Sequence, residues 1–116
     1  MVQMTMQLPD ELAAQIEPIR MWLPTLLELS LVGFRTLAIE TATEIVEFLK
    51  TGPSPRAMLS YHTSERAQSR LQRLFALNQA GMLSEIEQRE LDELERIEHI
   101  ITALKIQVAS QLQAKN

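Results

Sequence analysis

The first residues of the chain alternate between apolar and polar side chains. Val2, Met4, Met6 and Leu8 are apolar, and the residues between them are polar. A period of two is typical of a β-strand with one buried face. A lone strand leaves its backbone N–H and C=O groups unpaired, and no other segment has this pattern. We therefore expect residues 2–8 to pair with the same strand of a second copy.

Helical periodicity follows in residues 9–50. Pro9 suits the first position of a helix, and Pro18 should end or kink it, so a short helix is predicted over 9–17. Gly33 falls within the next apolar pattern, where it would cost about 1 kcal/mol relative to alanine. That pattern predicts one long helix over 24–50. Its recurring apolar residues are Leu27, Leu31, Phe34, Ala38, Ala42, Ile45 and Leu49.

A cluster of helix breakers at residues 51–55 divides the chain in two. Within it, Ser54 and Pro55 suit the N-cap and first position of a short helix that ends near residue 60. Three regions are therefore expected. They are a strand–helix–helix dimerisation region over 1–50, a linker with a short helix over 51–63, and a helical hairpin over 64–116.

The hairpin is predicted from its capping residues. Thr63 or Ser64 can cap the first helix, Gly81 can end it, and Ser84 with Glu87 forms a capping box for the second. The short loop makes the two helices antiparallel. The fold class expected is therefore mostly α, with one short strand paired across a dimer, a long helix and an antiparallel helical hairpin.

The second helix of the hairpin is much longer than the first, at roughly 29 against roughly 17 residues. Its last turns carry apolar surface that has no partner inside the hairpin. That surface must dock on the first half of the chain, on a second subunit or on another protein. The candidate partner-binding residues are Ile106, Val108 and Leu112.

Composition narrows the class of protein. The chain has 116 residues, a net charge of −4 and no cysteine, which excludes disulfides and thiolate metal sites. Residues 1–50 carry three basic and seven acidic side chains, a net charge of −4. The first residues lack the basic region and apolar core that are typical of a signal peptide, and Pro24, Glu28 and Arg35 interrupt the most apolar stretch, 22–39. We expect a cytoplasmic protein with no membrane segment.

The strand followed by Leu8-Pro9-Asp10-Glu11-Leu12 and an amphipathic helix resembles the ribbon-helix-helix family. Members are small dimeric DNA-binding proteins, and many are antitoxins of bacterial toxin–antitoxin pairs. The resemblance implies that two strands pair across the dimer axis and read bases in the major groove. The residues that it assigns to DNA reading are Gln3, Thr5 and Gln7. Glutamine is suited to this role because its amide bonds adenine in a bidentate manner.

The same resemblance places Met4, Met6 and Leu8 in the dimer core. We expect the dimer interface to continue along the long helix through Leu31, Phe34 and Ala38. No lysine or arginine flanks the strand. The second half, with Ser64-Glu65-Arg66-Ala67 and Leu83-Ser84, looks like small uncharacterised helical proteins of cyanobacteria, a resemblance that implies no activity.

Two charged patterns have both a functional and a structural interpretation. Arg66, Arg70 and Arg73 form a stripe that either meets phosphates or pairs with acids such as Glu90 and Glu93 across the hairpin. We favour ion pairs, because acidic residues are equally abundant there. The acidic positions of the long helix are a solvated face or a docking surface for a small basic protein such as a nuclease toxin. They are Glu40, Glu44 and Glu47.

No set of residues predicts catalysis. His99 follows Glu95 and Glu98, but Arg96 holds the position where a helical di-metal site needs an acid. There is no phosphate-binding glycine loop and no nucleophile motif, so we expect no cofactor, no metal and no enzyme activity.

Two functions remain open for a chain that associates with itself as a homodimer or a higher oligomer. One is an antitoxin-like or transcription-regulatory protein, whose strand faces DNA while its hairpin binds a protein partner. The other is a helical adaptor or assembly protein that binds another protein without contacting DNA.

Overall fold

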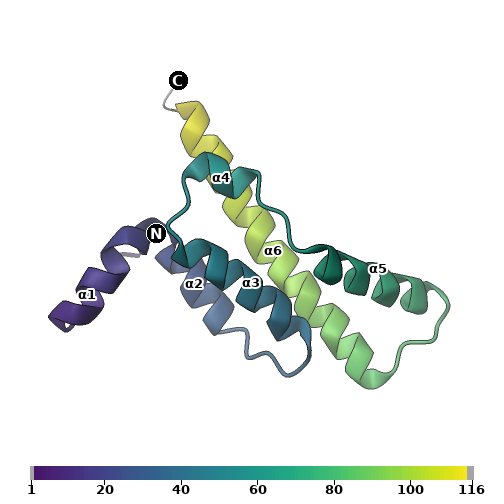
Figure 1. Ribbon diagram of the computed structural model, residues 1–116. Coiled ribbons are helices and arrows are strands. Elements are labelled where there is room, and N and C mark those ends of the chain that lie inside the picture. Colours follow the sequence, from purple (N-terminus) through teal and green to yellow (C-terminus); the bar gives the residue numbers. More distant parts are fainter. Residues whose placement is uncertain (1, 115–116) are drawn as a thin grey trace.

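The computed structural model describes residues 2–114 and is helical throughout its ordered core (Figure 1). Its longest helix is α6, and the other helices except α1 lie against or beside it. In chain order the elements are α1 (Asp10–Ile16), the 3₁₀ helix η1 (Glu17–Trp22), α2 (Leu23–Ser30), α3 (Ala38–Lys50), α4 (Pro55–Leu59), α5 (Glu65–Gln79) and α6 (Glu85–Ala114).

Helix α6 carries a continuous apolar stripe, and the core forms along it. Helices α2, α3, α4 and α5 each pack on this stripe. The apolar residues of this stripe recur every three or four positions, and this spacing keeps them on one face of the helix. The buried apolar residues of α6 are Leu91, Leu94, Ile97, Ile100, Ile101, Leu104 and Val108.

The predicted helical hairpin is confirmed. The Ser64 hydroxyl accepts a hydrogen bond from the Ala67 N–H at 3.1 Å and so caps α5. At the other end Gly81 has a φ of +69°. The Met82 N–H donates to the Leu77 carbonyl at 2.9 Å, and that of Gly81 to the Asn78 carbonyl at 3.0 Å. This is the Schellman arrangement that terminates a helix and reverses the chain.

The capping box at the start of α6 is also present. The Ser84 hydroxyl accepts from the Glu87 N–H at 3.2 Å, and the Glu87 carboxylate accepts from the Ser84 N–H at 3.1 Å. Hydrogen bonds from the Ser84 backbone and hydroxyl hold the pKa of Glu87 below its ordinary value. Ser54 caps the short helix α4 in the same way, through the Ala57 N–H at 3.1 Å.

The long helix expected over 24–50 is wrong. Helix α2 ends at Ser30, residues 31–37 form a loop in which Gly33 has a φ of +71°, and α3 begins at Ala38. The loop is held by Glu93 of α6, whose carboxylate accepts from the Arg35 N–H at 3.1 Å and from the Thr36 hydroxyl at 2.6 Å. The break lets α2 and α3 both reach α6 and bury apolar residues on it (Figure 1).

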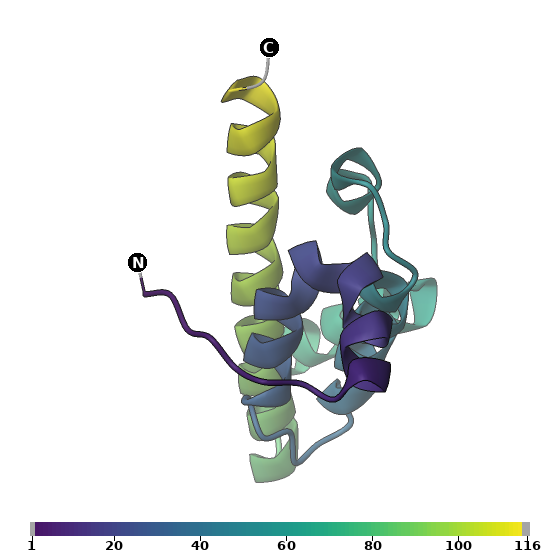
Figure 2. The ribbon, with the colours of Figure 1, turned by 90° about the vertical axis from the view of Figure 1, so that its left-hand side faces the viewer.

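The predicted N-terminal strand is not present in the single chain. Residues 2–114 contain no strand, and residues 2–9, which we call the arm, have no regular secondary structure. Figure 2 shows the arm leaving α1 and ending clear of the helices. No other segment of residues 2–114 is a strand, so the arm forms no ladder within its own chain.

The linker and the first helices are joined by a close contact. Trp22 is buried, and its indole N–H donates to the Pro53 carbonyl at 3.0 Å. Gly52 has a φ of +68°, and a Cβ at this position would lie 3.3 Å from the Pro18 carbonyl oxygen. Only glycine therefore fits without displacing η1. As expected at Pro18, the α-helix ends just before it, at Ile16.

One ion pair connects the two helices of the hairpin. Glu90 of α6 is only 4% exposed, and Arg70 of α5 donates to both of its carboxylate oxygens at 2.8 Å. The hydrogen bond to Glu90 raises the pKa of Arg70. The ion-pair interpretation is thus confirmed for Arg70. Arg66 instead lies 3.7 Å from Glu40 of α3, at the surface.

Replacing Arg70 should strongly destabilise the fold. Arg70→Met leaves the buried Glu90 carboxylate without a counter-charge, so the free energy of unfolding should fall by about 3 kcal/mol. The matched control is Arg66→Met, which removes an exposed pair and should cost less than about 1 kcal/mol. Urea denaturation measures both. An equal loss of unfolding free energy in the two variants would contradict the stabilising role of the buried Arg70–Glu90 ion pair.

The capping box predicts a pH dependence with a defined sign. Because the folded pKa of Glu87 is depressed, its contribution is present above the unfolded pKa of glutamate and is lost as the pH falls through the folded pKa. Glu87→Gln should therefore lower the melting temperature at pH 7, and the difference from the native chain should vanish in acid. Glu95→Gln, on the exposed face of the same helix, is the charge-matched control. If the difference in melting temperature were as large in acid as at pH 7, it could not come from the ionised Glu87 carboxylate.

Candidate functional site

The residues predicted to read DNA lie on the arm. Gln3, Thr5 and Gln7 are all exposed. The apolar face of the arm is exposed as well: Met4 is 85% exposed and Met6 is 64% exposed, while Leu8 is half-buried. Both faces of the arm are therefore open to solvent in the single chain.

Exposed apolar surface is concentrated in the first third of the chain. Within residues 2–114, thirteen large apolar side chains are exposed, and nine of them lie between residues 2 and 39. Helix α1 buries no residue at all. A large exposed apolar surface often marks an interaction site. The nine residues are Val2, Met4, Met6, Leu12, Met21, Leu27, Leu31, Leu37 and Ile39.

The remaining residues predicted for the dimer interface divide into two groups. Leu31 and Phe34 lie in the loop between α2 and α3, where Leu31 is exposed and Phe34 is half-buried. Phe34 lines a groove of about 370 Å³ between α2 and α3 that has no charged residue in its wall. Ala38 is buried in the core of its own chain and does not reach the surface.

The end of α6 packs within its own chain. Val108 is 3% exposed and belongs to the core, and Leu112 is half-buried against it. Ile106 is 65% exposed. Val108 and Leu112 are thus covered within the same chain, whose helices α2, α3 and α4 contact α6. Among the candidate partner-binding residues only Ile106 remains open.

The acidic positions of α3 are engaged in local contacts. Glu40 lies 3.7 Å from Arg66, and Glu47 lies 3.7 Å from Lys50. The Glu44 carboxylate accepts hydrogen bonds from the Ser64 N–H at 3.0 Å and the Ser64 hydroxyl at 2.8 Å. Glu44 therefore stabilises the start of α5, where a negative charge is favoured by the helix dipole.

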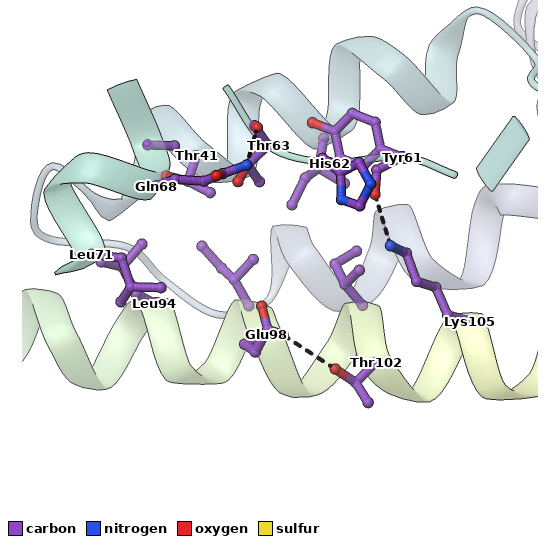
Figure 3. Close-up of a pocket in the computed structure, with 14 residues that line it drawn as sticks. Thr41, Tyr61, His62, Thr63, Gln68, Leu71, Leu94, Glu98, Thr102 and Lys105 are labelled. Carbon is purple, nitrogen blue, oxygen red and sulfur yellow. Dashed lines mark hydrogen bonds between the residues drawn. The ribbon is translucent and has the colours of Figure 1, made fainter. Parts of the chain in front are cut away.

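A separate cavity of about 190 Å³ lies between α3, α5, α6 and residues 61–63 (Figure 3). Its floor is apolar and buried, formed by Ile45, Leu94, Ile97 and Ile101. Polar side chains surround the floor from several elements. They are Thr41, Tyr61, His62, Thr63, Gln68, Glu98, Thr102 and Lys105.

Several groups at this cavity are fixed by hydrogen bonds. The Lys105 ammonium donates to the Tyr61 carbonyl at 2.7 Å, and the Gln68 amide donates to the Thr63 carbonyl at 2.8 Å. The Tyr61 ring stacks on Phe48 with ring centroids 4.4 Å apart. Burial, and secondarily the charge of Glu44, raises the pKa of the Tyr61 hydroxyl.

Sequence reasoning missed this cavity. Its apolar floor residues are typical of any helical core, and its polar residues come from segments far apart in the chain. No periodicity or short motif connects Thr41, Tyr61 and Lys105, so no local signal indicates that they share a site.

Neither a metal cluster nor a membrane span is found in residues 2–114. No group of three His, Cys, Asp or Glu residues there is arranged to hold a metal ion. None of the described helices combines the length and the apolar character that crossing a membrane requires.

Comparisons with family models, with curated proteins and with solved structures find no match to this chain.

Proposed function

We propose that this protein is a homodimeric, antitoxin-like DNA-binding regulator, in which two arms pair into a β-ribbon. The observation that carries the proposal is the exposure of Val2, Met4 and Met6 on the apolar face of the arm. Pairing with a second arm satisfies the backbone groups of both and turns Met4 and Met6 away from water.

The extent of the exposed apolar surface supports a dimer. The nine exposed apolar residues between 2 and 39 offer on the order of 1,000 Å² per chain, against about 800 Å² per partner in a typical stable interface. Leu31 and the uncharged groove beside Phe34 extend this surface beyond the arm. Interfaces between identical subunits are depleted in charged residues at their centre, as this groove is.

The opposite face of the arm supports DNA reading. In a paired ribbon Gln3, Thr5 and Gln7 share one face, because successive side chains of a strand point to opposite sides. A two-stranded ribbon fits the major groove, and amides and hydroxyls bond the edges of bases there. The hairpin stays outside this contact, where Ile106 and neighbouring surface remain open to a protein partner such as a small basic nuclease toxin.

A second candidate function is a helical adaptor that forms the same dimer without binding DNA. The observation that favours it is charge: no basic residue precedes Arg20, and the first 50 residues carry three basic against seven acidic side chains. Phosphate contacts supply most of the affinity of DNA-binding proteins, and an acidic surface repels the DNA backbone.

The test of DNA reading is a triple substitution on the polar face. Gln3→Ala, Thr5→Ala and Gln7→Ala together should abolish sequence preference while the dimer persists, because they leave the apolar face intact. Selection from a random duplex library, followed by sequencing, measures the preference. The matched control replaces three exposed glutamines of α6, Gln107, Gln111 and Gln113, by alanine. If the native protein enriches no DNA sequence, DNA reading is refuted and the adaptor function is favoured.

The test of the ribbon is a charge on its apolar face. Met6→Lys places an unpaired ammonium in the seam and should convert the dimer to a monomer. Because Met6 lies outside the helical core, the monomer should keep its helical circular dichroism. The control is Gln7→Lys, one residue along on the polar face, which should stay dimeric. Light scattering gives the masses, and a Met6→Lys protein that remains dimeric would refute the shared ribbon.

A further inference from the structure

The cavity beside residues 61–63 has a lysine at one end and an apolar floor. In Figure 3, Lys105 and His62 lie toward one end, and Leu71 and Leu94 lie toward the other, below Thr41 and Gln68. Between them runs the buried floor of α6, including Ile97. An amphipathic lining of this shape favours a ligand with one polar head and one apolar chain.

The polar end contains a cation with unused hydrogen-bonding capacity. Lys105 is half-buried, and its ammonium donates one hydrogen bond, to the Tyr61 carbonyl at 2.7 Å. An ammonium carries three donors. Within residues 2–114, no carboxylate lies within 4.0 Å of the Lys105 ammonium. A partly buried cation in this position is stabilised by an anion that it can bond directly.

The only acid in the cavity wall is displaced from Lys105 along the helix. Glu98 lies seven residues earlier on α6, about 10 Å away along the helix axis at 1.5 Å per residue. Its carboxylate accepts from the Thr102 hydroxyl at 3.5 Å. Glu98 therefore lies along the side of the cavity and leaves the Lys105 end to an incoming anion.

We propose that this cavity binds a small monocarboxylic acid with an apolar chain. The carboxylate is held by Lys105, with His62 as a neighbouring donor, and the chain lies over Ile101 and Ile97 toward Leu71. The volume of about 190 Å³ is below the 300–1,000 Å³ of pockets for larger ligands, which limits the acid to on the order of ten non-hydrogen atoms. No residue of the arm lines this cavity, so the ligand site does not depend on the function proposed for the arm.

Three probes with the same six-carbon chain test the head group. Hexanoate, hexylammonium and 1-hexanol are titrated into the ¹⁵N-labelled full chain, and amide shifts around the cavity are followed by NMR. Hexanoate should bind with a Kd of about 1 mM or tighter. The amine and the alcohol should bind at least tenfold more weakly. Equal binding of all three, or a preference for the amine, would overturn the assignment of the head group to Lys105.

Variants test the site itself. Lys105→Met should weaken hexanoate binding at least tenfold, Lys105→Arg should retain it, and the matched control Lys50→Met should leave it unchanged. Lys105→Met also removes the hydrogen bond to the Tyr61 carbonyl and could change the cavity itself. A second variant is therefore needed that keeps this hydrogen bond. Ala67→Leu fills the cavity from α5 and should abolish binding. Native-like binding by Ala67→Leu would overturn the proposal, whatever Lys105→Met shows.

Discussion

The apolar stripe of α6 is the constraint on which the rest of the structure depends. A helix of 30 residues with a buried stripe from Leu91 to Val108 cannot be stable until other elements cover it. Helices α2, α3, α4 and α5 supply that cover from both sides of the linker. The core is therefore a single layer of short helices on one long helix, and the positions of the short helices follow from where they contact it.

Polar residues of α6 determine those positions more sharply than apolar contacts do. Glu90 holds α5 through Arg70, Glu93 holds the loop between α2 and α3, and Lys105 holds the chain at Tyr61. Apolar packing tolerates sliding, whereas a partly buried charge must find its particular hydrogen-bond partners. The three contacts thus specify a register for each covering segment, and the last of them also forms one end of the cavity.

The arm differs from the helical core in that most of its apolar side chains are not covered by the rest of the described chain. Beyond position 39, four large apolar side chains of the described residues are exposed, namely Phe75, Met82, Ile86 and Ile106, whereas Val2, Met4 and Met6 of the arm are exposed and α1 buries no residue. The arm and α1 therefore present apolar side chains that the rest of the described chain does not cover. In the proposed dimer, a second arm would cover those of the arm and leave its polar face free.

The amino-acid sequence by itself determined what depends on neighbouring residues. The caps at Ser54 and Ser84 and the turn at Gly81 follow from contacts within a few positions, so the sequence predicts them, and it limits the cap of α5 to Thr63 or Ser64. The break at 31–37 depends on Glu93, 58 residues from Arg35, while the apolar spacing is the same on both sides of it. The strand pattern of the arm needs a second backbone, and the cavity joins Thr41, Tyr61 and Lys105 from separate elements. Only the tertiary structure decides such features, because their energies come from groups that lie far apart in the sequence.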